Sequence, residues 1–235
     1  MLLSIGLGSC SPEQRPGPAE TTGPARKTNV LLITIDTLRA DYLGCYGRSD
    51  IATPVIDGLA AGGVRFEQAV AQAPLTTPSH ASILTGTYPP LHKIRDVGGF
   101  VLNKEVPTMA ELMSAAGFDT AAFVGAAVLN RRYGLDRGFK IYNDDMGSRQ
   151  EDQKLPGVVA EVRGDIVTQR AIDWLENRSA ISGQRSAIPF LLWVHYYDPH
   201  FPYDPPEPYR QRYAKDGYAG EVAYTDELIG RLLKS

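Results

Sequence analysis

The chain has 235 residues, of which 43% are hydrophobic, which is enough to build the core of one large or two small domains. A formal net charge of −3 gives no general attraction to nucleic acid, and the sequence has no basic patch with interleaved aromatic residues. The two cysteines, Cys10 and Cys45, cannot form a disulfide framework, and no apolar run approaches the roughly 18 residues of a membrane span.

The N-terminal residues predict a targeting segment followed by a linker. Residues 1–10 are apolar and end in Leu7-Gly8-Ser9-Cys10, which resembles a bacterial lipobox, although the usual basic residues before it are missing. This pattern predicts export to the periplasm or cell envelope, with a lipid anchor on Cys10 as the only membrane attachment; a frayed apolar tail is the alternative. Residues 11–28, rich in Pro, Gly, Glu and Thr, predict a disordered linker, which leaves residues 29–235 for the folded domain.

The first expected strand leads to a carboxylate. Residues 29–36 form a β-rich apolar run, typical of a strand that is buried on both faces of a parallel sheet. Asp36 comes where the run ends, at the carboxyl edge at which open α/β sheets bind ligands. A carboxylate at this edge suits a hard divalent cation such as Ca²⁺, Mg²⁺ or Mn²⁺. The alternative is that Asp36 caps the following turn.

A helix and a second strand are expected next. Residues 53–63 begin with Thr-Pro and end with Gly-Gly, as helices commonly do, and residues 64–70 predict a strand. Cys45, which precedes this helix, is expected to pack as a small hydrophobe. Strands that alternate with helices predict an α/β fold with a doubly wound, mostly parallel sheet flanked by helices.

Residues 74–86 carry the pattern on which the functional interpretation rests. Pro78 fits the first position of a helix, Thr77 its N-cap and Gly86 its closing residue. Thr76 then precedes a helix N-terminus, whose free N–H groups and partial positive charge suit a tetrahedral anion. A hydroxyl there can attack the central atom of a bound ester while the helix holds the ester oxygens. An ordinary capped helix without chemistry is the alternative.

This stretch resembles the motif of the sulfatase family in the alkaline phosphatase superfamily. The family pattern is Cys or Ser, any residue, Pro, Ser and Arg, then Leu-Thr-Gly after a short spacer; here it is Thr76-Thr77-Pro78-Ser79-His80, followed by Leu84-Thr85-Gly86. Family sulfatases convert the Cys or Ser to formylglycine, and Thr76 is not a substrate for that maturation. The resemblance therefore implies a catalytic Thr76 whose hydroxyl attacks directly, with His80 as a second catalytic candidate in place of Arg.

Two further stretches resemble family motifs. Residues 36–41, Asp-Thr-Leu-Arg-Ala-Asp, are similar to the first metal motif, which implies that Asp36 and Thr76 ligate a divalent cation (Ca, Mg or Mn, with Zn as an alternative) and that Asp41 orients the loop. Residues 88–97 are similar to the segment after Leu-Thr-Gly, with Val97 where Asn is usual. Within it, Arg95 and His92 are substrate-binding candidates; a solvated Arg95 and a structural His92 are the alternatives.

The later elements alternate again. Helices are expected at 106–117, 163–178 and 218–233, with strands at 119–125 and 189–197. After the last strand, Pro199-His200 matches a Pro-His pair of the family, in which the His holds the transferred group or protonates the leaving oxygen. His195 precedes it within the apolar run and is expected to be a satisfied core histidine.

Together these features predict a sulfatase-family hydrolase of sulfate, phosphate or phosphonate esters, of small-molecule or glycan origin, with Thr76 as nucleophile and no nucleic-acid partner. The family's downstream Asp-His-Gly motif, which supplies more metal ligands, does not occur here. We therefore expect these residues to form the N-terminal part of the catalytic domain, with the C-terminal part absent, and to be weakly active alone. The alternative is a non-catalytic module of the same fold that binds sulfated or phosphorylated glycans.

Overall fold

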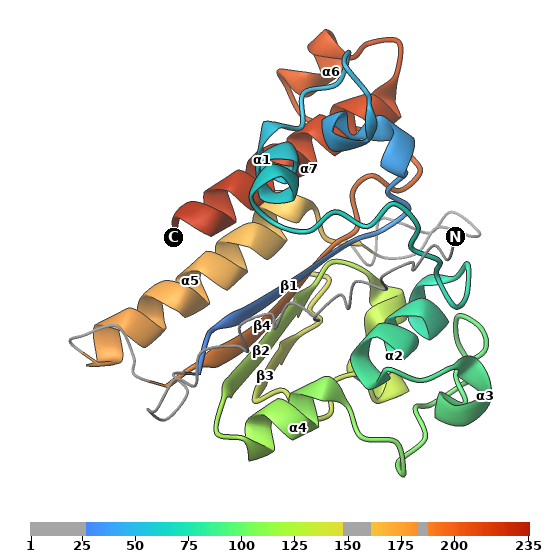
Figure 1. The fold of residues 1–235 in the computed structure, drawn as a ribbon, viewed down its shortest axis with the longest axis vertical. Helices are drawn as coiled ribbons and strands as arrows, with labels where there is room; N and C mark the ends of the chain where they lie inside the picture. Colours follow the sequence, from blue (N-terminus) through green and yellow to red (C-terminus); the bar gives the residue numbers. More distant parts are fainter. Residues whose placement is uncertain (1–26, 148–160, 183–187) are drawn as a thin grey trace, which may run out of the picture.

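A parallel β-sheet forms the centre of the protein. The computed structural model describes residues 27–147, 161–182 and 188–235, so the lipobox-like segment and residues 11–26 lie outside the described residues. Within them, four parallel strands follow the order β1-β4-β2-β3 (Figure 1). The strands are β1 (Val30–Ile35), β2 (Asp119–Val124), β3 (Ile141–Asn143) and β4 (Phe190–Tyr196).

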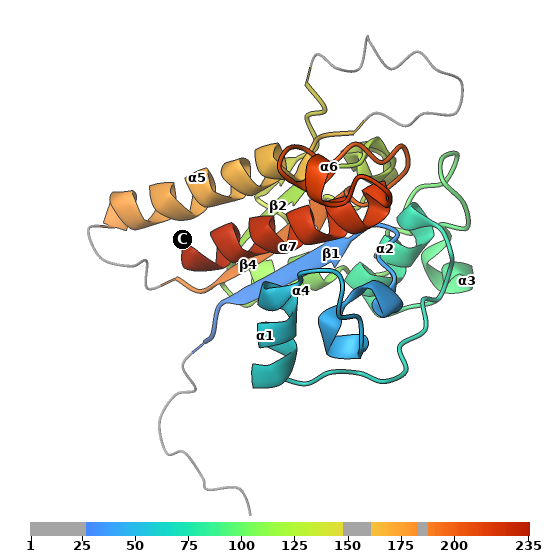
Figure 2. The same ribbon diagram turned by 90° about the horizontal axis from the view of Figure 1, so that it is seen from above.

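Helices cover both faces of this sheet. They are α1 (Pro54–Gly62), α2 (Thr76–Thr85), α3 (Pro89–His92), α4 (Met109–Ala115), α5 (Gly164–Ser182), α6 (Tyr209–Arg212) and α7 (Gly217–Lys234). Figure 2 shows α5 and α7 side by side over one face, with α2 and α4 toward the other. The predicted parallel α/β fold is therefore confirmed. No helix among the described residues is long and apolar enough to span a membrane.

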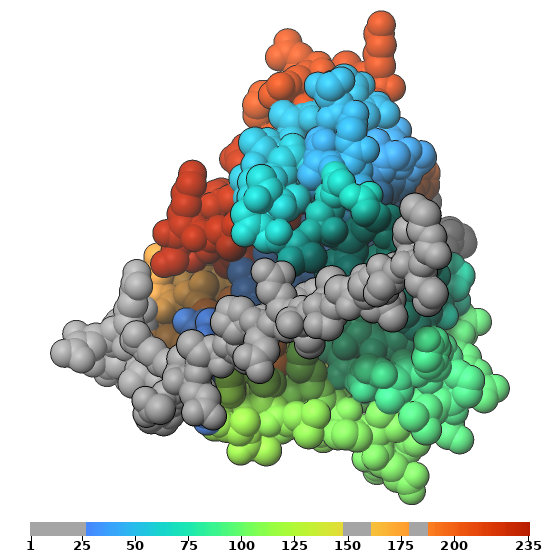
Figure 3. Space-filling model, viewed as in Figure 1, coloured from blue at the N-terminus to red at the C-terminus, as the bar shows by residue number. Residues whose placement is uncertain are grey.

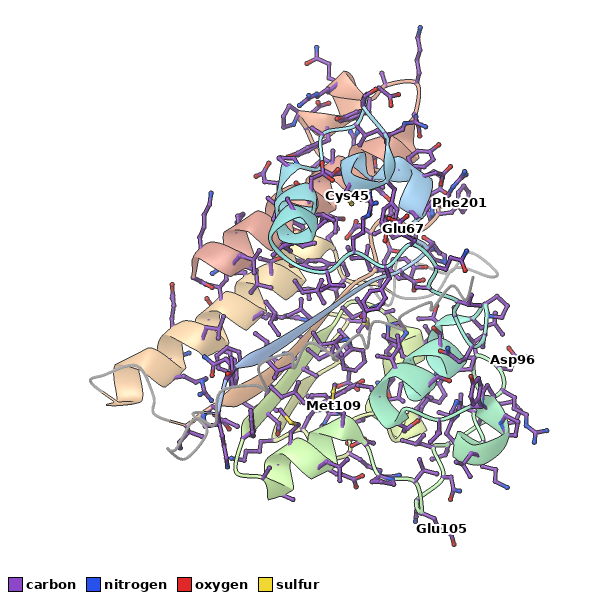
Figure 4. All side chains as sticks on the ribbon, viewed as in Figure 1. Cys45, Glu67, Asp96, Glu105, Met109 and Phe201 are labelled. Atoms are coloured by element: carbon purple, nitrogen blue, oxygen red, sulfur yellow. The ribbon has the colours of Figure 1, made fainter. Side chains whose placement is uncertain are left out.

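Alternation along β4 supplies both halves of the core. Val194 belongs to the apolar cluster formed with α5 and α7, whereas Trp193 belongs to the cluster on the α2 side. Both side chains are fully buried, because successive strand residues point to opposite faces of the sheet. Met109 of α4, labelled in Figure 4, packs against the cluster of Trp193, and Cys45 packs against a third cluster beside α7.

The expectation that β1 is buried on both faces is wrong. All six residues of β1 are only half-buried, because β1 pairs with β4 on one side and is the edge strand of the described sheet. An apolar run therefore indicated a strand correctly but did not distinguish an edge position from a central one.

The predicted strand at residues 64–70 is also wrong. This segment is exposed and forms no strand, and in Figure 3 the teal chain between α1 and α2 lies on the molecular surface. Its larger apolar side chains, Val64, Phe66 and Val70, are between 67% and 82% exposed. β-branched residues favour a strand mainly where their side chains pack against neighbouring strands and become buried, and the side chains of this segment do neither.

The N-terminus of α2 differs from the expectation by two residues. Thr77 is not the N-cap: Leu75 is, without a side-chain capping bond, and Thr76 is the first helical residue. The Thr77 hydroxyl instead donates to the carbonyl of Val128, 2.8 Å away. Gly86 ends the helix as predicted, with a left-handed φ of 64° that glycine adopts without a steric penalty.

Candidate functional site

The carboxyl edge of the sheet opens into a cleft of about 680 Å³ beside the start of α2. Asp36 leaves β1 at this edge, and its backbone N–H continues the ladder to the carbonyl of Tyr196, at 2.9 Å. The loop after β4 reaches the same edge. Cleft-lining side chains that bear on the chemistry are those of Asp36, Thr37, Thr76, His80, Val97 and His200.

Asp36 and Thr76 lie against each other in this cleft. The Thr76 hydroxyl donates to Asp36 Oδ2 at 3.0 Å, and Oδ1 is 3.4 Å away. Asp36 is only 8% exposed, so its carboxylate has little water around it. This contact holds the hydroxyl proton toward the carboxylate and leaves the lone pairs of Thr76 Oγ1 available to a bound ester.

Thr37 holds the two loops of the cleft together in a strained conformation. Its φ is 51°, in the left-handed region that β-branched residues rarely adopt. The Thr37 hydroxyl donates to the carbonyl of Pro199 at 2.5 Å, and the hydroxyl of Tyr218 donates to the Thr37 carbonyl at 2.8 Å. These two bonds, from distant parts of the chain, offset the strain.

His80 contacts the backbone of Thr76, which lies one helical turn before it in α2. His80 Nδ1 lies 2.8 Å from the carbonyl oxygen of Thr76. A carbonyl only accepts, so Nδ1 carries the proton and Nε2 carries the lone pair. The side chain is almost fully buried, and burial lowers the pKa of His80. Neutral His80 therefore fixes the first turn of α2, which bears Thr76.

His195 is a buried histidine, as expected, but the described residues satisfy only one of its ring nitrogens. Nδ1 lies 2.9 Å from the hydroxyl of Thr34. Nε2 has no hydrogen-bond partner within the part of the chain that the structure describes, and it faces Asp36 Oδ2 at 3.8 Å. Burial, together with the neighbouring His80, holds the pKa of His195 well below its usual range, so the ring is neutral.

His200 reaches the cleft from the loop after β4. Its ring stacks on that of Tyr197, with 4.3 Å between centroids. Nδ1 donates to the carbonyl of Phe201 at 2.7 Å, so Nε2 is the nitrogen that remains for chemistry. The sequence predicted this position from Pro199-His200, and the structure brings His200 into the same cleft as Asp36 and Thr76.

Two predicted substrate-binding residues do not line the cleft. His92 is fully buried: the backbone N–H of Ile94 donates to Nδ1 at 3.2 Å, so Nε2 donates to the hydroxyl of Ser82 at 3.0 Å. Both nitrogens serve the fold, which is the structural alternative noted above. Arg95 is exposed outside the cleft.

Residues that the sequence analysis missed include Thr34 and Tyr197. Both line the cleft, and each contacts a histidine. The sequence did offer one signal: Thr34 and His195 are polar residues within otherwise apolar strands. The structure shows that the two are register partners on β1 and β4. Neighbouring parallel strands place such partners side by side on one face.

The donor set of the cleft suits a hard divalent cation only in part. Asp36 and Thr76 offer oxygen donors, as such cations prefer. Among the residues that the structure describes, however, no group of three or more His, Cys, Asp or Glu side chains could hold a metal ion. Asp36 and Thr76 are therefore part of a ligand shell at most, and Asp41, paired with Arg39 at the surface, is not in it.

Solved structures place this architecture in a known class. Ps i-CgsB, crystallised with k-i-k-neocarrahexaose, matches 88% of this chain and 54% of its own, with a TM-score of 0.69 and 24% identity. The phosphonate monoester hydrolase of Agrobacterium radiobacter matches 88% of this chain and 59% of its own, with a TM-score of 0.68 and 19% identity. These likenesses concern the fold alone.

Sequence comparison narrows the class to a family. The sequence model of the sulfatase family matches residues 28–235, so the chain belongs to the sulfatase family. It is 28% identical to an ulvan-active sulfatase of Formosa agariphila, over all of this chain and 51% of that protein. It is also 28% identical to human arylsulfatase A, over 89% of this chain and 48% of that protein. The chain thus spans about half the length of these relatives.

Proposed function

We propose that the protein hydrolyses sulfate, phosphate or phosphonate esters, with Thr76 as the nucleophile. The observation that carries this proposal is the 3.0 Å hydrogen bond between Thr76 Oγ1 and Asp36 Oδ2 in the cleft. Relatives named as sulfatases, and a structural neighbour named as a phosphonate monoester hydrolase, support the ester class. Because Thr76 cannot mature to formylglycine, phosphate and phosphonate esters are favoured.

In the first step, Thr76 Oγ1 attacks the sulfur or phosphorus atom and the bond to the ester oxygen breaks. The hydroxyl proton passes to Asp36, which already accepts it as a hydrogen bond. Backbone N–H groups at the start of α2 hold the developing negative charge on the ester oxygens. When bound, a divalent cation supplies further charge neutralisation at these oxygens.

His200 donates the proton that the leaving oxygen needs and later accepts one from the attacking water. Its Nε2, protonated before the attack, gives its proton to the leaving oxygen, since an alkoxide leaves poorly without one. Neutral Nε2 then accepts a proton from the water that attacks the covalent Thr76 ester. As the bond from Thr76 Oγ1 to sulfur or phosphorus breaks, Asp36 returns its proton to Oγ1, and the sulfate or phosphate product leaves. His80 contributes by holding the Thr76 carbonyl, and so acts through the nucleophile rather than on the substrate.

The test is turnover by variants of α2, expressed in the complete reading frame. We expect Thr76→Ala to lower kcat by at least about a thousandfold, as removal of a nucleophile does, and Thr76→Ser to retain measurable turnover. Thr85→Ala, which removes a hydroxyl bonded within the last turn of α2, is the matched control and should match the wild type. Aryl sulfate, aryl phosphate and aryl phosphonate diesters are the substrates assayed.

The alternative, a non-catalytic glycan-binding module, predicts glycan binding without turnover. It gains support from the apolar Val97 in the cleft lining, at the position where the family usually has Asn. Sulfated-glycan binding that survives both metal chelation and Thr76→Ala, with no turnover of any of the three esters, would establish it and exclude the hydrolase.

A further inference from the structure

A chain of polar contacts runs beneath the cleft from Trp193 to Asp36. The indole N–H of Trp193 donates to the hydroxyl of Thr34 at 2.9 Å, and the same hydroxyl lies 2.9 Å from His195 Nδ1. On the other side of the ring, His195 Nε2 faces Asp36 Oδ2. The sheet brings these side chains together. Thr34 and His195 are register partners on neighbouring strands, and Trp193 lies two residues before His195 on the same face of β4.

The donors and acceptors in this chain favour one tautomer of His195. An indole N–H can only donate, so Thr34 Oγ1 accepts from Trp193 and keeps its own proton to give. The acceptor within reach is His195 Nδ1, which leaves the ring proton on Nε2. The carboxylate across the ring favours the same arrangement, because a lone pair on Nε2 would face a negative charge in a poorly hydrated site.

We propose that His195 is a positioning residue, which presents an Nε2–H group to Asp36 and thereby orients the carboxylate that accepts the Thr76 proton. The effect on the Thr76 proton rests on the proposed function, whereas the tautomer of His195 does not depend on it. His80 and His195 then have opposite tautomers, although their rings lie edge to face with 4.7 Å between centroids. His80 carries its proton on Nδ1 toward the Thr76 carbonyl, and His195 carries its proton on Nε2 toward Asp36.

The first test reads the tautomer directly. The chain has four histidines, and a long-range ¹H–¹⁵N spectrum of protein labelled at histidine distinguishes the protonated ring nitrogen of each. We expect Nε2–H for His195, and substitution His195→Gln assigns its signals. An Nδ1–H tautomer for His195 would overturn the proposal, since the lone pair would then face Asp36. This measurement needs no turnover, so it tests the His195 tautomer even if the proposed hydrolysis is not observed.

The second test removes the hydroxyl that sets the tautomer. Thr34→Val keeps the shape of the side chain and leaves His195 in place, but His195 Nδ1 loses its donor. We expect the share of the Nε2–H tautomer to fall and kcat on the Thr76-dependent substrate to drop by about tenfold, with a smaller change in KM. If His195 had only a structural role, Thr34→Val would lower the stability of the protein but would not produce both the spectral change and the fall in kcat.

Thr120→Val is the matched control for the lost hydroxyl. Thr120, on β2 away from the cleft, accepts from the backbone N–H of Lys140 and donates to the carbonyl of Gly138. The control should lose stability as Thr34→Val does, yet keep the His195 spectrum and kcat of the wild type. If Thr34→Val leaves kcat unchanged, or if Thr120→Val lowers it equally, His195 does not act through Asp36.

Discussion

Glu221 is a carboxyl side chain that is buried beneath the loop carrying His200. It is 3% exposed, and its Oε1 accepts from the backbone N–H of Asp204 at 2.7 Å. Oε2 has no hydrogen-bond partner among the described residues. Burial, reinforced by the negative charges of Asp198, Glu161 and Asp204, raises the pKa of Glu221 to about 8. Neutral Glu221 therefore anchors the loop near neutral pH.

The raised pKa of Glu221 predicts a stability that depends on pH. Between the ordinary carboxyl pKa of 4.5 and about 8, the folded state keeps a proton that the unfolded state has released. The free energy of unfolding therefore falls as the pH rises across this window. We expect Glu221→Gln to flatten this fall, because its amide oxygen still accepts from Asp204 and cannot ionise.

Chemical denaturation of both proteins at pH 5, 6, 7 and 8 (roughly the window between the two pKa values) measures the effect. The two curves should converge at the acid end and separate toward the alkaline end, with Glu221→Gln the more stable. Parallel curves would show that Glu221 does not retain its proton on folding. Glu227→Gln, a change at an exposed position of α7, controls for the charge removed from the helix.

At the level of elements, α7 supplies the cap that α1 does not have in its own sequence. Thr53 precedes α1 but makes no side-chain capping bond. The carboxylate of Asp226, in the middle of α7 and 2% exposed, accepts instead from the backbone N–H groups of Val55 at 3.1 Å and Ile56 at 2.8 Å. A carboxylate at a helix N-terminus is favoured by both hydrogen bonding and the helix dipole.

Removal of this cap should loosen α1 without reaching the cleft. We expect Asp226→Ala to lower the free energy of unfolding by about 2 kcal/mol, since two bonds to a charged acceptor are lost. Asp226→Asn, which keeps one acceptor oxygen, should cost less. Hydrogen exchange of the α1 amides should accelerate in Asp226→Ala, while that of α2 stays unchanged; equal acceleration in both helices would instead indicate general destabilisation.

For the whole molecule, the cleft depends on segments that are far apart in the chain. Thr76 lies 40 residues after Asp36, and His195 lies 161 residues after its contact Thr34. The sheet brings these segments together because the parallel strands β1 and β4 end at one edge. A cation held by Asp36 and Thr76 would therefore link β1 to α2 and stabilise the folded state as a whole.

Added divalent cation should accordingly raise the stability of the protein. At a concentration 100 times its Kd, the cation should increase the free energy of unfolding by about 2.7 kcal/mol, as measured by thermal unfolding with Ca²⁺, Mg²⁺, Mn²⁺ or Zn²⁺ after chelation. Asp36→Asn should abolish the increase. Asp41→Asn, at an exposed carboxylate paired with Arg39, is the matched control and should retain it. An increase that survives in Asp36→Asn would place the cation elsewhere.

Local patterns were sufficient to predict most elements and to select three candidate residues that the structure brings into one cleft. The apolar run before Asp36, the Pro-Ser-His segment after Thr76 and the Pro-His pair at His200 are short-range signals. Strand order, by contrast, depends on pairing between distant segments. That is why the edge position of β1 and the unpaired course of residues 64–70 were not predicted, and why β3, with only three residues, was missed.

By itself, the sequence determined the α/β class, the family resemblance and the choice of Asp36, Thr76 and His200 as candidates, because each is recorded in a contiguous pattern. Only the tertiary structure decided that His92 serves the core and that His195 faces Asp36 with a nitrogen that no described residue satisfies. The physical reason is that the state of a buried imidazole depends on which donors and acceptors the fold places around it. Those partners come from other strands and helices, which no local pattern specifies.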